Sequence, residues 1–155
     1  MALMGWLRAK LSSRDTENDS DNEALVLTSE EENLDGLNLT SALAAHTAWK
    51  TRLSNELEGD SAEKLDISLL SQDNQCELGR WLYGEGSLKY SHIPEFNMVC
   101  RAHSEFHFCA AEVVIEHQSG AVEHAKSLLK GKFRQASNKN QLELVRFFAV
   151  AKKLL

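Results

Sequence analysis

Apolar side chains recur every three or four residues from position 37 to the end of the chain, which is the period of one helix face. The first long run predicts a helix of about five turns that ends at Gly59 and Asp60. The second starts at Pro94, a residue suited to the first turn of a helix, and ends near Gly120. The two predicted inner faces are Leu39, Leu43, His46, Trp49, Leu53 and Leu57, and Phe96, Val99, Cys100, His103, His107, Ala110, Val114 and His117.

Two more helices are expected after this second run. One covers residues 121–130 and is closed by Gly131, and the last begins at a cap on Ser137 or Asn138. The predicted inner face of the last helix is Leu142, Val145, Phe148 and Leu155.

A shorter helix around Cys76 is expected between the first two long ones. Asp73 or Asn74 is its predicted N-cap, glycines at 84 and 86 stop it, and residues 87–93 form a linker. No segment shows the alternation typical of a strand. The predicted fold class is therefore all-α, an antiparallel four-helix-bundle-like domain over residues 37–155 with an additional short helix that carries the cysteine.

The first 36 residues differ from the rest in composition. Residues 1–11 (MALMGWLRAKL) form a short amphipathic peptide, which we expect to dock onto a partner protein, with weak membrane association as the competing role. Residues 12–36 hold nine acidic groups against the single Arg14, which predicts an acidic flexible tether. Near its end, Thr28 and Glu31 form a capping-box pattern that predicts one brief helical turn.

Charge and cysteine content narrow the class of protein. The 155-residue chain has a formal net charge of −6 and no basic stripe, which argues against nucleic-acid binding. Three cysteines without the spacing of a disulfide framework, and the absence of a signal peptide, predict a reducing, cytoplasmic location. No run approaches the roughly 18 apolar residues of a transmembrane segment.

Four residues of metal-ligand type fall on predicted inner faces or beside them: His46, Cys76, His103 and His107. The last two are four residues apart, so one helix face carries both imidazoles. Buried imidazoles need polar partners, and one sulfur with three nitrogens suits a closed tetrahedral zinc site. The alternative from spacing alone is a set of ordinary buried residues satisfied by hydrogen bonds.

Two other metal chemistries do not fit the spacing. A zinc protease carries Glu directly after the first His of its pair, whereas Glu105 is the second residue after His103. A ferritin-like di-iron bundle carries Glu three residues before His, and no histidine here has Glu at that offset.

The chain resembles the bacterial chemoreceptor zinc-binding domain. The similarity rests on three motifs, His46-Thr-Ala-Trp49-Lys50, Cys76-Glu-Leu78-Gly79-Arg-Trp81-Leu-Tyr83-Gly84 and His103-Ser-Glu-Phe106-His107, and extends to Gly120 and Gly131-Lys-Phe133 with Ser137. It covers roughly residues 38–155. It implies that His46, Cys76, His103 and His107 bind zinc.

The resemblance also implies a function. Members of this family respond to zinc or to oxidants such as hypochlorite and belong to chemoreceptor and diguanylate cyclase pathways. We therefore expect a sensory or regulatory domain that acts on a signalling partner in trans, and a protein-interaction module with a purely structural zinc is the alternative. An enzyme is not expected, because a site closed by four ligands leaves no position for a substrate.

A homodimer is the oligomeric state that the resemblance suggests. Aromatic residues on the helix flanks are the candidate contacts: Trp81, Phe106, Phe108 and Phe147.

Overall fold

The structure is a computed structural model and describes residues 28–60 and 64–155. The peptide 1–11 and residues 12–27 of the predicted tether lie outside the described residues. The elements follow one another as α2 (Ser29–Glu32), β1 (Asn33–Leu34), β2 (Leu37–Asn38), α3 (Leu39–Glu58), α4 (Ile67–Ser71), α5 (Glu77–Trp81), η1 (Leu82–Gly86), α6 (Ser87–Tyr90), α7 (Pro94–Gln118), α8 (Val122–Leu128), η2 (Leu129–Phe133) and α9 (Arg134–Leu154).

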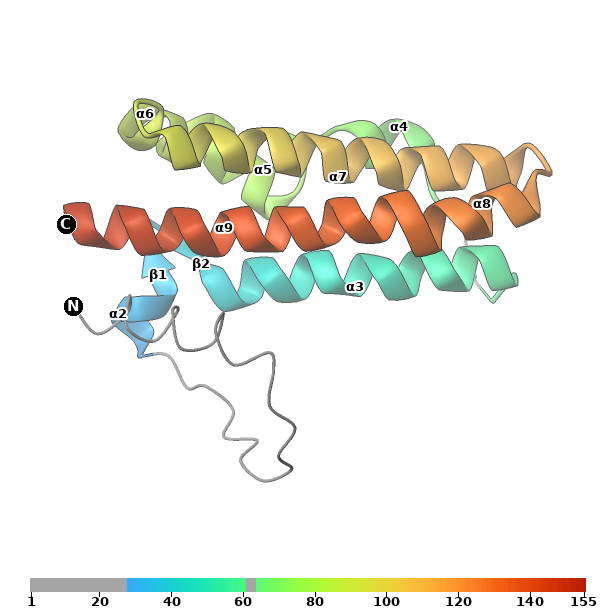
Figure 1. Cartoon of the computed structure of the whole chain (residues 1–155), viewed down its shortest axis with the longest axis horizontal. Helices are drawn as coiled ribbons and strands as arrows, with labels where there is room; N and C mark the ends of the chain where they lie inside the picture. The colour runs from blue at the N-terminus through green and yellow to red at the C-terminus, as the bar shows by residue number, and fades with distance from the viewer. Residues whose placement is uncertain (1–27, 61–63) are drawn as a thin grey trace, which may run out of the picture.

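The chain passes along the bundle four times in alternating directions (Figure 1). The first pass is α3, the second is the series of short helices α4, α5, η1 and α6, the third is α7, and the fourth runs through α8, η2 and α9. Helix α7 packs against α9, α8 and α4, and α3 packs against α9 and α7. The predicted all-α, four-helix-bundle-like fold is confirmed, with a second pass that is broken rather than continuous.

Local sequence signals explain the ends of the long helices. Asn38 caps α3, since its side-chain oxygen accepts a hydrogen bond from the Ser41 N–H at 2.8 Å. Gly59 ends α3 in the left-handed conformation, with φ at 77°, as its sequence position predicted. Pro94 occupies the first turn of α7, where its missing N–H costs no hydrogen bond.

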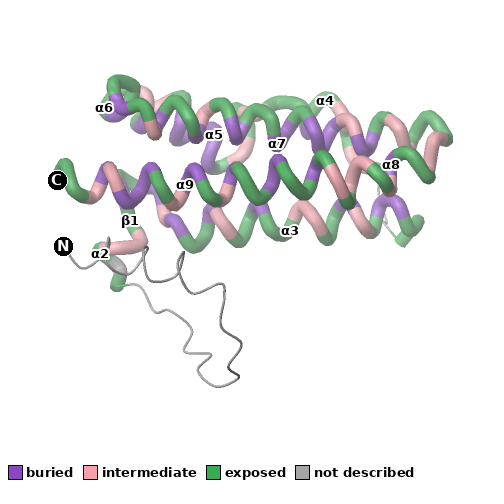
Figure 2. Tube along the Cα trace, viewed as in Figure 1, coloured by how far each residue is buried: buried purple, intermediate pink, exposed green. Residues whose placement is uncertain are grey.

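The long helices bury their facing sides in a common core (Figure 2). One group of buried side chains surrounds Trp81, Phe96 and Phe147, and a second surrounds Phe106 and Phe133. Three of the four aromatic residues predicted as dimer contacts are therefore core residues. Only Phe108 is exposed, at 62% of its surface, and it lies under the ammonium group of Lys132.

The two helices predicted over 121–130 and from 137 onward are one continuous helix. Gly131 does not end it, because its backbone stays in the right-handed region within the π-turn η2. Ser137, one of the two predicted caps, is instead fully buried inside α9. The inner face of α9 consists of Ala136, Ser137, Asn140, Glu143, Leu144, Phe147, Phe148, Ala149 and Ala151, while Leu142 and Leu155 point outward.

The linker predicted over residues 87–93 begins as helix α6 (Ser87–Tyr90). Gly84 departs from helical geometry, with φ of −105° and ψ of −113°, but the chain resumes a helix directly after Gly86. Tyr90 at the end of α6 is buried in the core, which holds this short helix in place.

Residues 28–36 are folded, although the sequence placed them in the flexible tether. The predicted capping box of Thr28 and Glu31 is present and starts α2. A hairpin follows, formed by the two-residue strands β1 and β2. In it Leu34 pairs with Leu37, and both side chains are 1% exposed. These two leucines supply the buried apolar area that the acidic residues around them lack. The folded part of the described chain therefore begins at residue 28, nine residues before the boundary that the composition indicated.

Substituting Leu34 by alanine is expected to lower the free energy of unfolding by about 3 kcal/mol, because it removes a fully buried side chain from the core. Denaturant unfolding followed by circular dichroism measures the change. Leu88→Ala, at a side chain that is 85% exposed, is the matched control and should change stability little. A Leu34 variant as stable as the control would show that the hairpin does not contribute to the fold.

Candidate metal centre

Four side chains from three passes of the bundle meet near its middle. His46 comes from α3, His103 and His107 come from successive turns of α7, and Cys76 comes from the chain just before α5. One potential ligand atom from each lies within 4.8 Å of the other three. We call these four residues the His3Cys cluster. The structure thus brings together all four residues that the sequence singled out.

Two of the imidazoles contact backbone carbonyls through Nδ1. The His46 ring lies 2.7 Å from the carbonyl oxygen of Ala42 through Nδ1, and the His107 ring lies 2.8 Å from that of Leu70, also through Nδ1. A carbonyl only accepts, so each Nδ1 carries the proton and each Nε2 keeps a free lone pair. Both Nε2 atoms are buried and have no hydrogen-bond partner in the described chain.

His103 sits between the other members of the cluster. Its Nε2 lies 3.3 Å from Cys76 Sγ and 3.0 Å from the carbonyl oxygen of Asp73. The ring centroids of His103 and His107 are 4.7 Å apart, and the His46 ring meets that of His103 edge-on at 5.2 Å. The three rings thus form one compact group.

Burial governs the electrostatics of the three histidines. Loss of solvation lowers the pKa of His46 and His107 and brings that of His103 to about 3, where the two neighbouring imidazoles add to the effect. All three are therefore neutral at physiological pH. Neutral imidazole is the form that binds a metal.

Cys76 is the N-cap of α5, in place of the predicted Asp73 or Asn74. Its Sγ accepts the backbone N–H of Gly79 at 3.3 Å, so the sulfur already receives a hydrogen bond of the kind that stabilises a thiolate. Burial has the larger and opposite effect and raises the pKa of the thiol. A cation at the cluster would offset that desolvation.

The cluster fits zinc on two grounds. Around a tetrahedral zinc with bonds of about 2.1 Å to nitrogen and about 2.3 Å to sulfur, ligand atoms lie roughly 3.5 Å apart. Atoms already within 4.8 Å of one another need only small side-chain adjustments to reach that spacing. In addition, two buried lone pairs without a partner are costly in a folded protein, and a metal satisfies both.

Comparison with known protein families agrees with this geometry. Residues 46–114 match the family model of the chemoreceptor zinc-binding domain, from the histidine on α3 to Val114 in the last turns of α7. Residues 46–114 thus belong to the chemoreceptor zinc-binding domain family. Zinc is accordingly the cofactor of this domain. No curated protein and no solved structure matches the chain.

The zinc-binding domain has supporting residues that the sequence did not reveal. Asp73 presents its carbonyl to His103, and its carboxylate accepts a 2.6 Å hydrogen bond from the Tyr83 hydroxyl. Burial, together with this bond and the carboxylate charge, raises the pKa of Tyr83 to about 12. Tyr83 could have been predicted as a supporting residue, because it belongs to the cysteine motif. Asp73 could not, because it contacts His103 through its backbone carbonyl, which every residue type has.

The other thiols and imidazoles of the zinc-binding domain lie outside the cluster. Cys100 is half-buried beside the core, and Cys109 is buried within it. His117 faces Glu56 at 4.0 Å, and His124 pairs with Glu116 at 3.0 Å. None of the described helices combines the length and the apolar content of a transmembrane segment.

Proposed function

We propose that His46, Cys76, His103 and His107 bind one zinc ion and that the domain is a sensory module, in which a change at Cys76 alters the bundle for a signalling partner. The observation that carries the proposal is the convergence of the two free Nε2 atoms of His46 and His107 on the third histidine and the thiol. The family is a sensory one, which supports the same function.

The structure of the second pass supports a sensory role for the cysteine. Bound zinc would hold the thiol of Cys76 as a thiolate, the form that oxidants attack. With hypochlorous acid, the sulfur gives up two electrons, a sulfur–oxygen bond forms and chloride leaves, so that a sulfenic acid results. Because Cys76 is also the N-cap of α5, oxidation of its sulfur would weaken the hydrogen bond to Gly79 as well.

A structural zinc in a protein-interaction module is the second candidate. It is favoured by the position of the cluster, since its three imidazoles are at most 3% exposed and lie between the core groups of both halves of the bundle. The two candidates differ in one respect: a structural site should keep its zinc when the protein meets mild oxidant.

The remaining parts of the proposal concern context. We propose that the domain acts in trans on a chemoreceptor or diguanylate cyclase pathway in the cytoplasm, as a homodimer, and without catalytic activity of its own. Phe108 is the exposed aromatic residue that remains as a candidate contact for the homodimer. The amphipathic peptide 1–11 is the proposed anchor to the partner.

Replacing Cys76 by serine is expected to lower zinc affinity on the order of 100-fold or more, because a hydroxyl is a far poorer zinc ligand than a thiolate. Competition with a chromophoric chelator measures the affinity. Wild-type protein treated with one equivalent of hypochlorite should release zinc, because Cys76 is oxidised. The Cys76→Ser variant should release no zinc by oxidation at this position.

Cys100→Ser is the matched control, since Cys100 is a half-buried thiol that lies outside the cluster. Its zinc affinity and its oxidant response should equal those of the wild type. If Cys76→Ser binds zinc as tightly as the wild type, Cys76 is not a zinc ligand. Zinc retention by the oxidised wild type would favour the structural alternative.

A further inference from the structure

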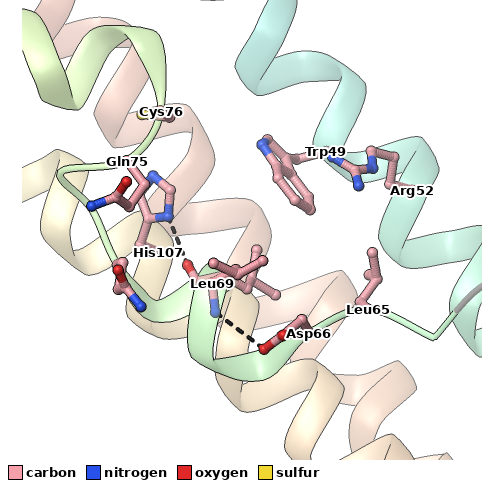
Figure 3. Close-up of a pocket in the computed structure, with 10 residues that line it drawn as sticks. Trp49, Arg52, Leu65, Asp66, Leu69, Gln75, Cys76 and His107 are labelled. Atoms are coloured by element: carbon pink, nitrogen blue, oxygen red, sulfur yellow. Dashed lines mark hydrogen bonds between the residues drawn. The ribbon is translucent and has the colours of Figure 1, made fainter.

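A pocket of about 340 Å³ opens beside the His3Cys cluster (Figure 3). Two members of the cluster, Cys76 and His107, lie in its wall. Figure 3 shows Trp49 and Arg52 on α3 at one side, and α4 with Leu69 and the chain around Gln75 at the other. The pocket therefore borders the residue that carries the sulfur of the cluster.

Arg52 is the cation of this pocket. Its guanidinium carbon lies 4.0 Å from the ring centroid of Trp49, one turn earlier on α3, so the aromatic face holds the charged group in place. Across residues 28–60 and 64–155, no carboxylate comes within ion-pair distance of Arg52. An arginine with a fixed position and a free charge at a pocket mouth is suited to an anion.

The acidic residue of the pocket is held at the start of α4 and forms no ion pair with Arg52. Asp66 also lines the wall, but its carboxylate caps α4 by accepting the backbone N–H groups of Ser68 at 2.8 Å and Leu69 at 3.2 Å. The rest of the wall is apolar, from Trp49 and the leucines of α4, or neutral, from glutamine side chains. A small anion thus meets the unpaired charge of Arg52, while the negative charge of Asp66 in the same wall is directed to the amide groups at the start of α4.

We infer that this pocket is a binding and entry site for small monoanionic oxidants and electrophiles, in which Arg52 concentrates the anion next to the sulfur of Cys76. The inference rests on the proposed function for the reactivity of Cys76, and it adds a preference for the charge of the reagent. Hypochlorite is an oxidant of this chemical class. A neutral oxidant of similar size would enter the same pocket without that advantage.

Iodoacetate and iodoacetamide test the preference, because they differ in charge and hardly in size. In both reactions the sulfur forms a bond to the methylene carbon and iodide leaves. The full chain, loaded with zinc, is treated with each reagent, and alkylation of each cysteine is followed by mass spectrometry. Arg52→Gln should lower the ratio of the iodoacetate rate to the iodoacetamide rate at Cys76 about threefold to tenfold, with the largest effect at low salt.

Three comparisons make the result specific. Arg52→Lys keeps the charge and should retain most of the ratio, whereas Arg134→Gln removes an exposed charge of α9 and should leave it unchanged. Leu69→Trp, at a side chain that is 62% exposed, should narrow the pocket and slow both reagents alike at Cys76. The ratios at Cys100 and Cys109 in the same samples should not respond to Arg52.

Equal ratios at Cys76 in wild type, Arg52→Gln and Arg134→Gln would overturn the inference. Unchanged rates in Leu69→Trp would show that reagents reach Cys76 by another route. Zinc content, measured in every variant, separates this outcome from a failure of the proposed function. The zinc affinity of Cys76→Ser tests the ligand set. The ratio of iodoacetate to iodoacetamide rates, measured in variants that keep their zinc, tests the role of the pocket.

Discussion

Replacing Gly79 by alanine is expected to lower the zinc affinity of this domain at least 100-fold while the bundle stays helical. A β-carbon at this position would lie 1.8 Å from the carbonyl oxygen of Asp73 and 2.8 Å from its carbonyl carbon. Both are backbone atoms, so no side-chain rotation relieves the overlap, and the chain before Cys76 has to move. That chain carries the acceptor of His103 and the cluster's only sulfur.

The loss should come from displaced ligands and not from unfolding. The long helices α3, α7 and α9 make their contacts with one another independently of Gly79. Chelator competition gives the zinc affinity, and far-ultraviolet circular dichroism gives the helix content. Gly131→Ala is the matched control, because a β-carbon there meets nothing within 4 Å and the residue lies inside a helix. Zinc affinity within threefold of wild type in Gly79→Ala would show that the close approach is not needed.

Removing zinc is expected to destabilise the domain by about 4 kcal/mol relative to protein kept at free zinc 1,000-fold above the dissociation constant. For a domain of this size, such a change lowers the midpoint of thermal unfolding by on the order of 10 °C. The physical cause lies in the cluster, where the metal-free protein leaves the buried Nε2 atoms of His46 and His107 without partners.

Thermal unfolding with added zinc and with excess chelator measures this difference. The variant His107→Ala serves as the reference, since it lacks one ligand and should show a much smaller shift between the two conditions. A wild-type midpoint that is the same in zinc and in chelator would contradict both the ligand set and the contribution of zinc to stability.

The sequence was a good guide where a feature depends on side-chain type and local spacing. The period of three and four predicted α3 and α7 with their ends at Gly59, Pro94 and Gly120. The four members of the His3Cys cluster were chosen for their chemistry and their motifs, and the structure places them together.

The sequence was a poor guide where tertiary packing overrides local preference. Gly131 and Ser137 are ordinary helix-boundary residues, yet the packed neighbours keep the chain helical through both. Leu34 and Leu37 are too few to mark a folded segment by composition, but each is buried by the bundle.

The backbone of the second pass was the least predictable part of the site. The carbonyls of Leu70 and Asp73 hold two of the histidines only because the chain is not one continuous helix there, where those groups would bond within the helix. No residue type encodes a free carbonyl. Sequence motifs can therefore name ligands without naming the groups that orient them.

Both ends of the described chain lie at the same pole of the bundle (Figure 1), and Lys152 of α9 donates hydrogen bonds to the carbonyls of Glu30 and Asn33. A unit whose ends meet can be inserted into a loop of another protein, or appended to it, without spreading the host chain. From His46 to the start of α3 is seven residues, or roughly 10 Å at the rise of an α-helix. A shift at the cluster would therefore arise within about two helical turns of the pole at which both ends of the described chain lie.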